Sequence, residues 1–196
     1  MIRPKIRHVL AVLALLAAAS SPVAAQSLQL GKLGVGGTGC PAGSVSAQLG
    51  NGGKSISLKF MSYQASAGGA RSFDRKACGI AIPVVVPPGM SVAVVGVDYR
   101  GASKLPSGAS AVFSAEYFFA GSKGEKATRT LKGPASGKFT VADKGALVWS
   151  ACGADVNFRI NTSLKVNTTG GRNASIGLRS QDVSVAATYR LQWKSC

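Results

Sequence analysis

The chain has almost no histidine. Its single histidine, His8, lies within the first 25 residues. Serine and cysteine nucleophiles are usually activated by a histidine base, and protein zinc sites use histidine or closely spaced cysteine ligands. The four cysteines include no C-x-x-C pair. The sequence therefore argues against histidine-based catalysis and a zinc site beyond residue 25, and we expect no metal or other cofactor.

Acidic residues are also scarce. Seven Asp and Glu stand against 23 Lys and Arg, which gives a formal net charge of +16. Arg3, Lys5 and Arg7 supply three of these positive charges, so residues 26–196 carry +13. A basic surface attracts polyanions such as acidic polysaccharide, lipopolysaccharide or nucleic acid. The composition thus predicts association with anionic polymers and says nothing about fold.

The shortage of carboxylates also limits acid and base catalysis. Glycoside cleavage needs two carboxyl groups facing each other across a groove. Asp98 and Glu116 are the only pair in strongly strand-like segments. A glycan-active hydrolase that uses these two residues is therefore the alternative to a non-enzymatic function.

Long apolar runs are missing except near the start of the chain. The run Val9 to Ala19 is too short to span a membrane as a helix. It follows a basic start and precedes the small residues Val23 and Ala25, which is the pattern of a secretory signal peptide. We expect cleavage between Ala25 and Gln26, removal of residues 1–25, and a secreted or periplasmic product whose 171 residues form one domain.

The cysteines would then reach a compartment where disulfides form. Four cysteines allow three pairings. We expect Cys40 to pair with Cys78 and Cys152 with Cys196, because each bridge then closes a modest loop within one half of the chain. A disulfide across a loop of this size contributes about 4 kcal/mol in the chain-entropy description.

A short glycine-rich stretch, "GVGGTG" from Gly34 to Gly39, matches the dinucleotide fingerprint G-x-G-x-x-G. That fingerprint requires a preceding strand, a following helix and an acidic residue about 20 positions later. Here the glycines lead into Cys40-Pro41, and the first acidic residue is Asp74. We interpret residues 26–39 as a flexible N-terminus and 40–196 as the folded domain.

Alternation with a period of two dominates the rest of the chain. Val156, Phe158 and Ile160 alternate with polar residues, and "SISLKF" and the last stretch repeat the pattern. About ten short strands separated by turns predict an all-β fold, an antiparallel β-sandwich of jelly-roll-like type with two disulfides. A closed β-barrel is the alternative. Two apolar runs flank Pro87-Pro88-Gly89, and we expect them to form adjacent antiparallel strands.

Two groups of residues are candidate binding residues. "VDYRG" is expected at the end of a strand, where it could form a small recognition tip in which Tyr99 offers a ring and Arg100 a planar guanidinium for anionic groups. Asn157, Arg159 and Asn161 form a polar stripe that could hydrogen-bond a sugar or phosphate. The remaining positive charge is spread along the chain, which argues against a dedicated nucleic-acid groove. Asn161, Asn167 and Asn173 begin glycosylation sequons, which matter only in a host that glycosylates exported proteins.

Several segments together resemble the family called domain of unknown function 4360. They are "GTGCPAGS", "FMSYQASAG", "RKACGIAIPVVVPPG", "VDYRGASKLPSG", "EYFFAG", "WSACGADVNFRINTSL" and "YRLQWKSC". The resemblance implies a small secreted β-rich domain with four cysteines in this order, and it implies no activity or site residues. From the positive net charge and the missing catalytic groups, we expect a non-enzymatic exported protein that binds anionic envelope or extracellular polymers through its basic surface.

Overall fold

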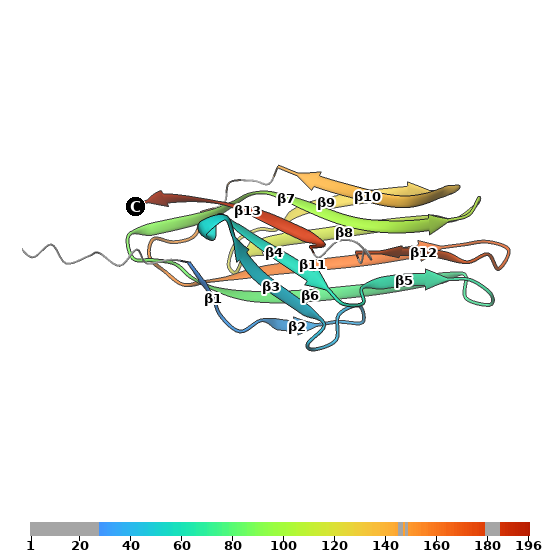
Figure 1. The fold of residues 1–196 in the computed structure, drawn as a ribbon, viewed down its shortest axis with the longest axis horizontal. Coiled ribbons are helices and arrows are strands. Elements are labelled where there is room, and N and C mark those ends of the chain that lie inside the picture. Colours follow the sequence, from blue (N-terminus) through green and yellow to red (C-terminus); the bar gives the residue numbers. More distant parts are fainter. Residues whose placement is uncertain (1–27, 145–146, 148, 179–184) are drawn as a thin grey trace, which may run out of the picture.

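The protein consists almost entirely of β-strands. A computed structural model describes residues 28–144, 147, 149–178 and 185–196, so the expected signal peptide lies outside the described residues. Among these residues, no helix is long and apolar enough to cross a membrane. The strands are β1 (Gln29–Leu30), β2 (Gly34–Gly36), β3 (Val45–Gly50), β4 (Ser55–Phe60), β5 (Gln64–Ala67), β6 (Phe73–Val85), β7 (Met90–Leu105), β8 (Ser110–Phe119), β9 (Glu125–Lys132), β10 (Ala135–Asp143), β11 (Val156–Asn167), β12 (Ala174–Gly177) and β13 (Ala187–Ser195) (Figure 1).

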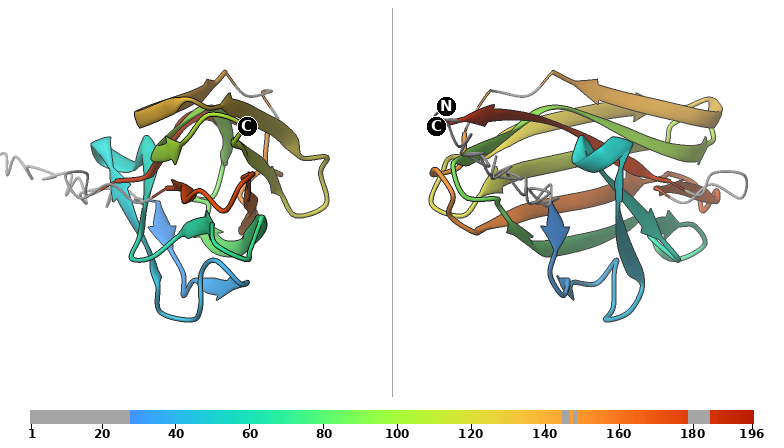
Figure 2. Two further views of the ribbon diagram at one scale, coloured as in Figure 1. Left: turned by 90° about the vertical axis from the view of Figure 1, so that its right-hand side faces the viewer. Right: turned by 60° about the vertical axis from the view of Figure 1, so that its left-hand side comes forward.

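The strands form two antiparallel sheets. The six-stranded sheet has the order β1-β6-β11-β8-β9, with β2 also paired to β6. The seven-stranded sheet has the order β3-β4-β13-β7-β12-β5, with β10 also paired to β7. Figure 2 shows the strands of both sheets around a common core. The β-sandwich prediction is confirmed, and the closed-barrel alternative is wrong because the strands divide into two separate sheets.

The core lies between the sheets and is rich in aromatic rings. Tyr99 of β7 contacts Phe113 of β8 with ring centroids 4.8 Å apart, and Phe158 of β11 contacts Tyr189 of β13 at 5.1 Å. Each contact joins one sheet to the other. The alternation predicted for β4 and β11 is confirmed, since the apolar positions of both strands turn toward this core.

The chain crosses between the sheets at Pro87-Pro88-Gly89. The expectation that the flanking strands pair with each other is wrong, because β6 belongs to the six-stranded sheet and β7 to the seven-stranded sheet. Each strand buries one face against the same core, and their partners come from distant parts of the chain. Alternation identifies the buried face of a strand but not its neighbours. The segment "GNGGKS" forms a hairpin turn between the paired strands β3 and β4.

The N-terminal segment 28–39 is attached to the sandwich. Leu28 is buried, and β1 and β2 both pair with β6. The Gly31 backbone NH donates to the carbonyl of Pro83 at 2.8 Å. These contacts correct the expectation of a flexible N-terminus for the part of residues 26–39 that the structure describes.

The glycines of "GVGGTG" permit close packing against β6. A Cβ atom at Gly37 would collide with the carbonyl oxygen of Ala77, and one at Gly39 would collide with the ring of Tyr63. The segment continues through Cys40 toward β3. Glycine is therefore required here by contact with the protein's own backbone and core.

Gly39→Ala is expected to lower the free energy of unfolding by about 1–3 kcal/mol, because the added methyl group overlaps a buried ring that must move. Gly36→Ala is the matched control, since nothing lies within 4 Å of a Cβ atom at that position. Urea denaturation of both variants measures the difference. Equal shifts in the two midpoints would contradict the packing explanation.

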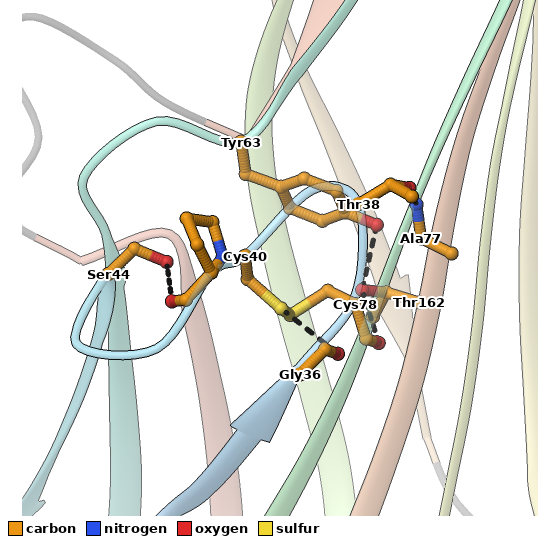
Figure 3. Close-up of a disulfide and its surroundings, with 9 residues drawn as sticks. Gly36, Thr38, Cys40, Ser44, Tyr63, Ala77, Cys78 and Thr162 are labelled. Carbon is orange, nitrogen blue, oxygen red and sulfur yellow. Dashed lines mark hydrogen bonds between the residues drawn. A yellow bond between two sulfur atoms is a disulfide. The ribbon is translucent and has the colours of Figure 1, made fainter.

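Both predicted disulfides are confirmed, Cys40 with Cys78 and Cys152 with Cys196. The first attaches the loop after β2 to β6, as Figure 3 shows. Close to it, the Thr162 hydroxyl donates to the Tyr63 hydroxyl at 3.0 Å (Figure 3). The second attaches the C-terminal residue to the segment before β11.

Candidate functional site

A groove of about 450 Å³ lies on the outer face of the six-stranded sheet. Strands β2, β6, β11, β8 and β9 all contribute to it. The pairing of these strands brings residues that are distant in the chain, such as Gly36 and Ser163, to one surface. The residues that line it include Gly36, Arg75, Gly79, Ser114, Glu116, Lys126, Thr128, Asn161 and Ser163.

One row of paired residues crosses the groove. The register aligns Gly36 with Gly79, Gly79 with Asn161, Asn161 with Glu116, and Glu116 with Lys126. With strands about 4.8 Å apart, a row of five strands extends over roughly 19 Å. Two glycines leave the backbone accessible at one end, and three polar side chains occupy the other end.

A second row supplies hydroxyl groups. Ala77 of β6 is aligned with Ser163 of β11, Ser163 with Ser114 of β8, and Ser114 with Thr128 of β9. Hydroxyl groups both donate and accept hydrogen bonds. The second row can therefore bind other hydroxyl groups without selecting one orientation.

The outer face of this sheet is strongly basic. The outward positions of β6, β9 and β11 carry five exposed cationic side chains, those of Arg75, Lys126, Lys132, Arg159 and Lys165. Among the described side chains that line the groove, Glu116 is the only carboxylate. Its nearest carboxylate oxygen lies 4.0 Å from the Lys126 ammonium, and both side chains are exposed to solvent. An ion pair of this kind contributes little to stability.

The predicted stripe on β11 lies partly in the groove. Asn161 lines it, and Arg159 is exposed two residues earlier on the same face. Asn157 lies further along the strand, half-buried, and its side-chain oxygen is buried without a hydrogen-bond partner among the described residues. The outward direction of the stripe agrees with the alternation, while its role in binding stays a prediction.

The two residues of "VDYRG" do not form a recognition tip. Tyr99 is 1% exposed, and its hydroxyl is hydrogen-bonded to that of Tyr189 at 3.0 Å, so the ring belongs to the core. Arg100 is exposed on the outer face of the seven-stranded sheet, opposite the groove. The structure corrects the expectation because β7 continues to Leu105 and is not interrupted at Gly101, where the Phe139 ring packs over the glycine.

The carboxylates of the alternative hydrolase lie on opposite sides of the molecule. Asp98 is on the outer face of β7, where it pairs with Arg190. Glu116 is on the outer face of β8 in the other sheet. The buried neighbours of both residues fill the core between them. The two carboxylates therefore do not face each other across a groove, which removes this catalytic pair.

Three tyrosines of the core have shifted pKa values. Burial raises the pKa of Tyr63 to about 12, and the hydrogen bond from Thr162 opposes this shift. Burial also raises the pKa of Tyr99 and of Tyr189 above the ordinary value. Within the described residues, no cluster of three His, Cys, Asp or Glu could hold a metal ion. The side chains of Arg75, Asn161 and Lys126, which line the groove, supply hydrogen-bonding groups and charge.

Sequence reasoning did not identify the groove as a unit. Arg75 and Asn161 are far in the chain from Glu116 and Lys126, and only the pairing of β6, β11, β8 and β9 brings them to one face. The alternation of β8 already marks Ser114 and Glu116 as outward positions. This alternation identifies which side of β8 faces solvent, but it does not identify the strands that pair with β8.

The three sequons are at exposed asparagines. Asn161 lies within the groove, in the middle of β11. Asn167 ends β11, and Asn173 immediately precedes β12. A glycan on Asn161 would occupy the groove.

Comparisons with known proteins find a relative in sequence and a likeness to solved structures. An "Uncharacterized secreted protein" of Arthroderma benhamiae is 34% identical over 169 residues, which cover 82% of this chain and 69% of the relative. A solved structure of TmCBM61 in complex with beta-1,4-galactotriose aligns with 84% of this chain and 88% of its own, with a TM-score of 0.33 and 10% identity. That likeness is too distant to indicate a ligand here. The model of the family described as Domain of unknown function (DUF4360) matches residues 26–196, and the chain belongs to this family.

Proposed function

We propose that this is a secreted, non-catalytic protein that binds a segment of an acidic extracellular polysaccharide in the groove of the six-stranded sheet. The observation that carries the proposal is the groove itself, in which a polar row and a hydroxyl row lie on a basic face. Secretion is supported by the signal-peptide pattern of residues 1–25 and by the secreted relative.

The groove has the groups that a hydroxyl-rich ligand needs. Asn161 can donate and accept hydrogen bonds, and the hydroxyls of Ser114, Thr128 and Ser163 can do the same. Gly36 and Gly79 lack side chains, so a sugar ring could approach the backbone between β2 and β6. Arg75 and Lys126 add positive charge for the acidic groups.

The absence of catalysis is proposed on two grounds. The expected carboxylate pair is divided between two outer faces, which leaves Glu116 as the one carboxylate among the described residues of the groove. Residues 26–196 contain no histidine to serve as a base. Both observations favour binding over hydrolysis.

The test is binding of the exported, oxidised protein to polygalacturonate and to uncharged dextran, at low and high salt. Arg75→Ala and Asn161→Ala are each expected to weaken polygalacturonate binding roughly fivefold to tenfold, since each removes a hydrogen-bonding group from the groove. Arg100→Ala is the matched control, because it removes the same charge from the opposite face. It is expected to change affinity less than twofold.

Two results would contradict the proposal. One is equal weakening by Arg75→Ala and Arg100→Ala, which would mean that only total charge matters. The other is polygalacturonate binding that disappears completely in high salt, because binding by charge alone is screened while hydrogen bonds in a shaped groove persist.

A further inference from the structure

The carboxylate of Glu116 is an unexpected group in a basic groove. It lies in the row that runs from Gly36 to Lys126, between Asn161 and Lys126, on a face with five cationic side chains. Each of these cations would attract a polyanion, whereas Glu116 repels one. A groove that served only to collect negative charge would be better without it.

The side chain of Glu116 also packs against the connection between β8 and β9. It packs directly over the backbone of Gly124, where a Cβ atom would collide with its Cγ and with its carboxylate group. The 4.0 Å separation from Lys126 leaves the carboxylate available for other partners. Glu116 therefore presents a positioned acceptor to the groove.

A carboxylate and a hydroxyl are complementary. An ionised carboxylate only accepts hydrogen bonds, and it can accept two from neighbouring donors. Sugar hydroxyls provide such donors, whereas ionised phosphate and sulfate groups have no proton to donate. Glu116 thus favours a ligand with hydroxyl groups at this point and disfavours one with dense negative charge.

The two cations of the groove lie on different strands, Lys126 beside Glu116 and Arg75 far from it. Arg75 is on β6 and Lys126 on β9, three strand spacings apart, or roughly 14 Å across the sheet. Between them are Asn161, Ser163 and Ser114. This arrangement suits a chain whose charges are separated by hydroxyl-bearing surface.

We propose that Glu116 determines the specificity of the groove, by accepting hydrogen bonds from sugar hydroxyls and excluding densely charged polymers. The ligand class that fits is a polyuronate, a polysaccharide with a carboxylate and free hydroxyls on its sugar units. The inference rests on the proposed function and adds the choice among polyanions.

The experiment compares affinity for polygalacturonate with affinity for heparin at one fixed salt concentration. The wild-type protein is expected to prefer polygalacturonate. Glu116→Gln is expected to weaken polygalacturonate binding about fivefold by loss of a charged acceptor, and to strengthen heparin binding about threefold by loss of repulsion. The ratio of the two affinities should therefore change by more than tenfold.

Two further variants separate position from charge. Gly124→Ala keeps the carboxylate but displaces it, and should weaken polygalacturonate binding without changing net charge. Asp98→Asn removes a carboxylate from the opposite face and should leave the affinity ratio unchanged. Denaturation midpoints of all variants show that each one is folded before its affinity is interpreted.

The possible failures are distinct. If Arg75→Ala and Asn161→Ala leave polygalacturonate binding unchanged, the proposed function is wrong. If those variants weaken binding but Glu116→Gln and Asp98→Asn shift both affinities by the same factor, only the role of Glu116 is wrong. A wild-type preference for heparin would also overturn it and would favour a sulfated or nucleic-acid ligand.

Discussion

Replacement of Cys40 and Cys78 by alanine is expected to lower the free energy of unfolding by about 4 kcal/mol and also to weaken ligand binding. The bridge closes a separation of 38 residues, and its loss restores the conformational freedom of that loop in the unfolded chain. Cys78 borders the groove next to Gly36 and Gly37, whose position depends on the loop that Cys40 anchors. Urea denaturation and polygalacturonate titration of the double variant measure the two effects.

The second disulfide provides a matched control. Cys152 and Cys196 close a separation of 44 residues, so the chain-entropy contribution is the same, about 4 kcal/mol. Neither cysteine borders the groove. Their replacement by alanine should therefore destabilise the fold equally at temperatures where the variant stays folded, yet leave binding unchanged. Equal loss of binding in both double variants would mean that the groove depends on overall stability and not on the first bridge.

The fold class could be predicted because period-two alternation directly reports one buried face of a strand. Phe158 and Ile160 in β11, and Tyr189 and Leu191 in β13, are buried as the pattern indicates. The disulfide pairing could also be predicted, since short loops favour it. Neither signal depends on which strands are neighbours.

The wrong predictions concern features that depend on which strands pair with each other. Tyr99 stands beside two charged residues, which suggested an exposed tip, but the alternation of β7 turns its ring into the core and Asp98 and Arg100 outward. The N-terminal glycines suggested flexibility, but β6 offers an open edge on which β1 and β2 pair. Strand register and sheet order come from packing of the whole chain, which local sequence patterns do not contain.

The groove illustrates the same limit for function. Asn161 could be singled out from the stripe on β11, but its neighbours Gly79 and Glu116 come from strands 82 and 45 residues earlier in the chain. Glu116 was considered as a catalytic partner of Asp98, and the structure instead places it beside Lys126 in a basic groove. A residue's chemistry could be recognised in the sequence, while the surface that uses it required the fold.

Alkaline pH is expected to unfold the protein steeply, because its largest buried polar side chains are tyrosines that must stay protonated. Tyr63, Tyr99 and Tyr189 all have their pKa raised by burial. In the unfolded chain a tyrosine titrates near pH 10. Below that pH all three are neutral in both states, and their contribution to stability is fully present.

Above pH 10 the unfolded chain loses these protons while the folded protein keeps them, so unfolding releases protons and the free energy of unfolding falls as pH rises. Each tyrosine contributes about 1.4 kcal/mol per pH unit, and for Tyr63 the loss continues to its folded pKa of about 12. Three such groups give up to about 4 kcal/mol per pH unit, which urea denaturation between pH 9 and about pH 11.5 would measure.

Tyr63→Phe is the informative variant, because Thr162 keeps its contact with the Cys78 carbonyl at 3.4 Å. It should change stability little at neutral pH and reduce the alkaline slope by about one third. A slope unchanged from that of the wild type would mean that Tyr63 ionises without unfolding, and that its hydroxyl is reached by solvent in the folded protein.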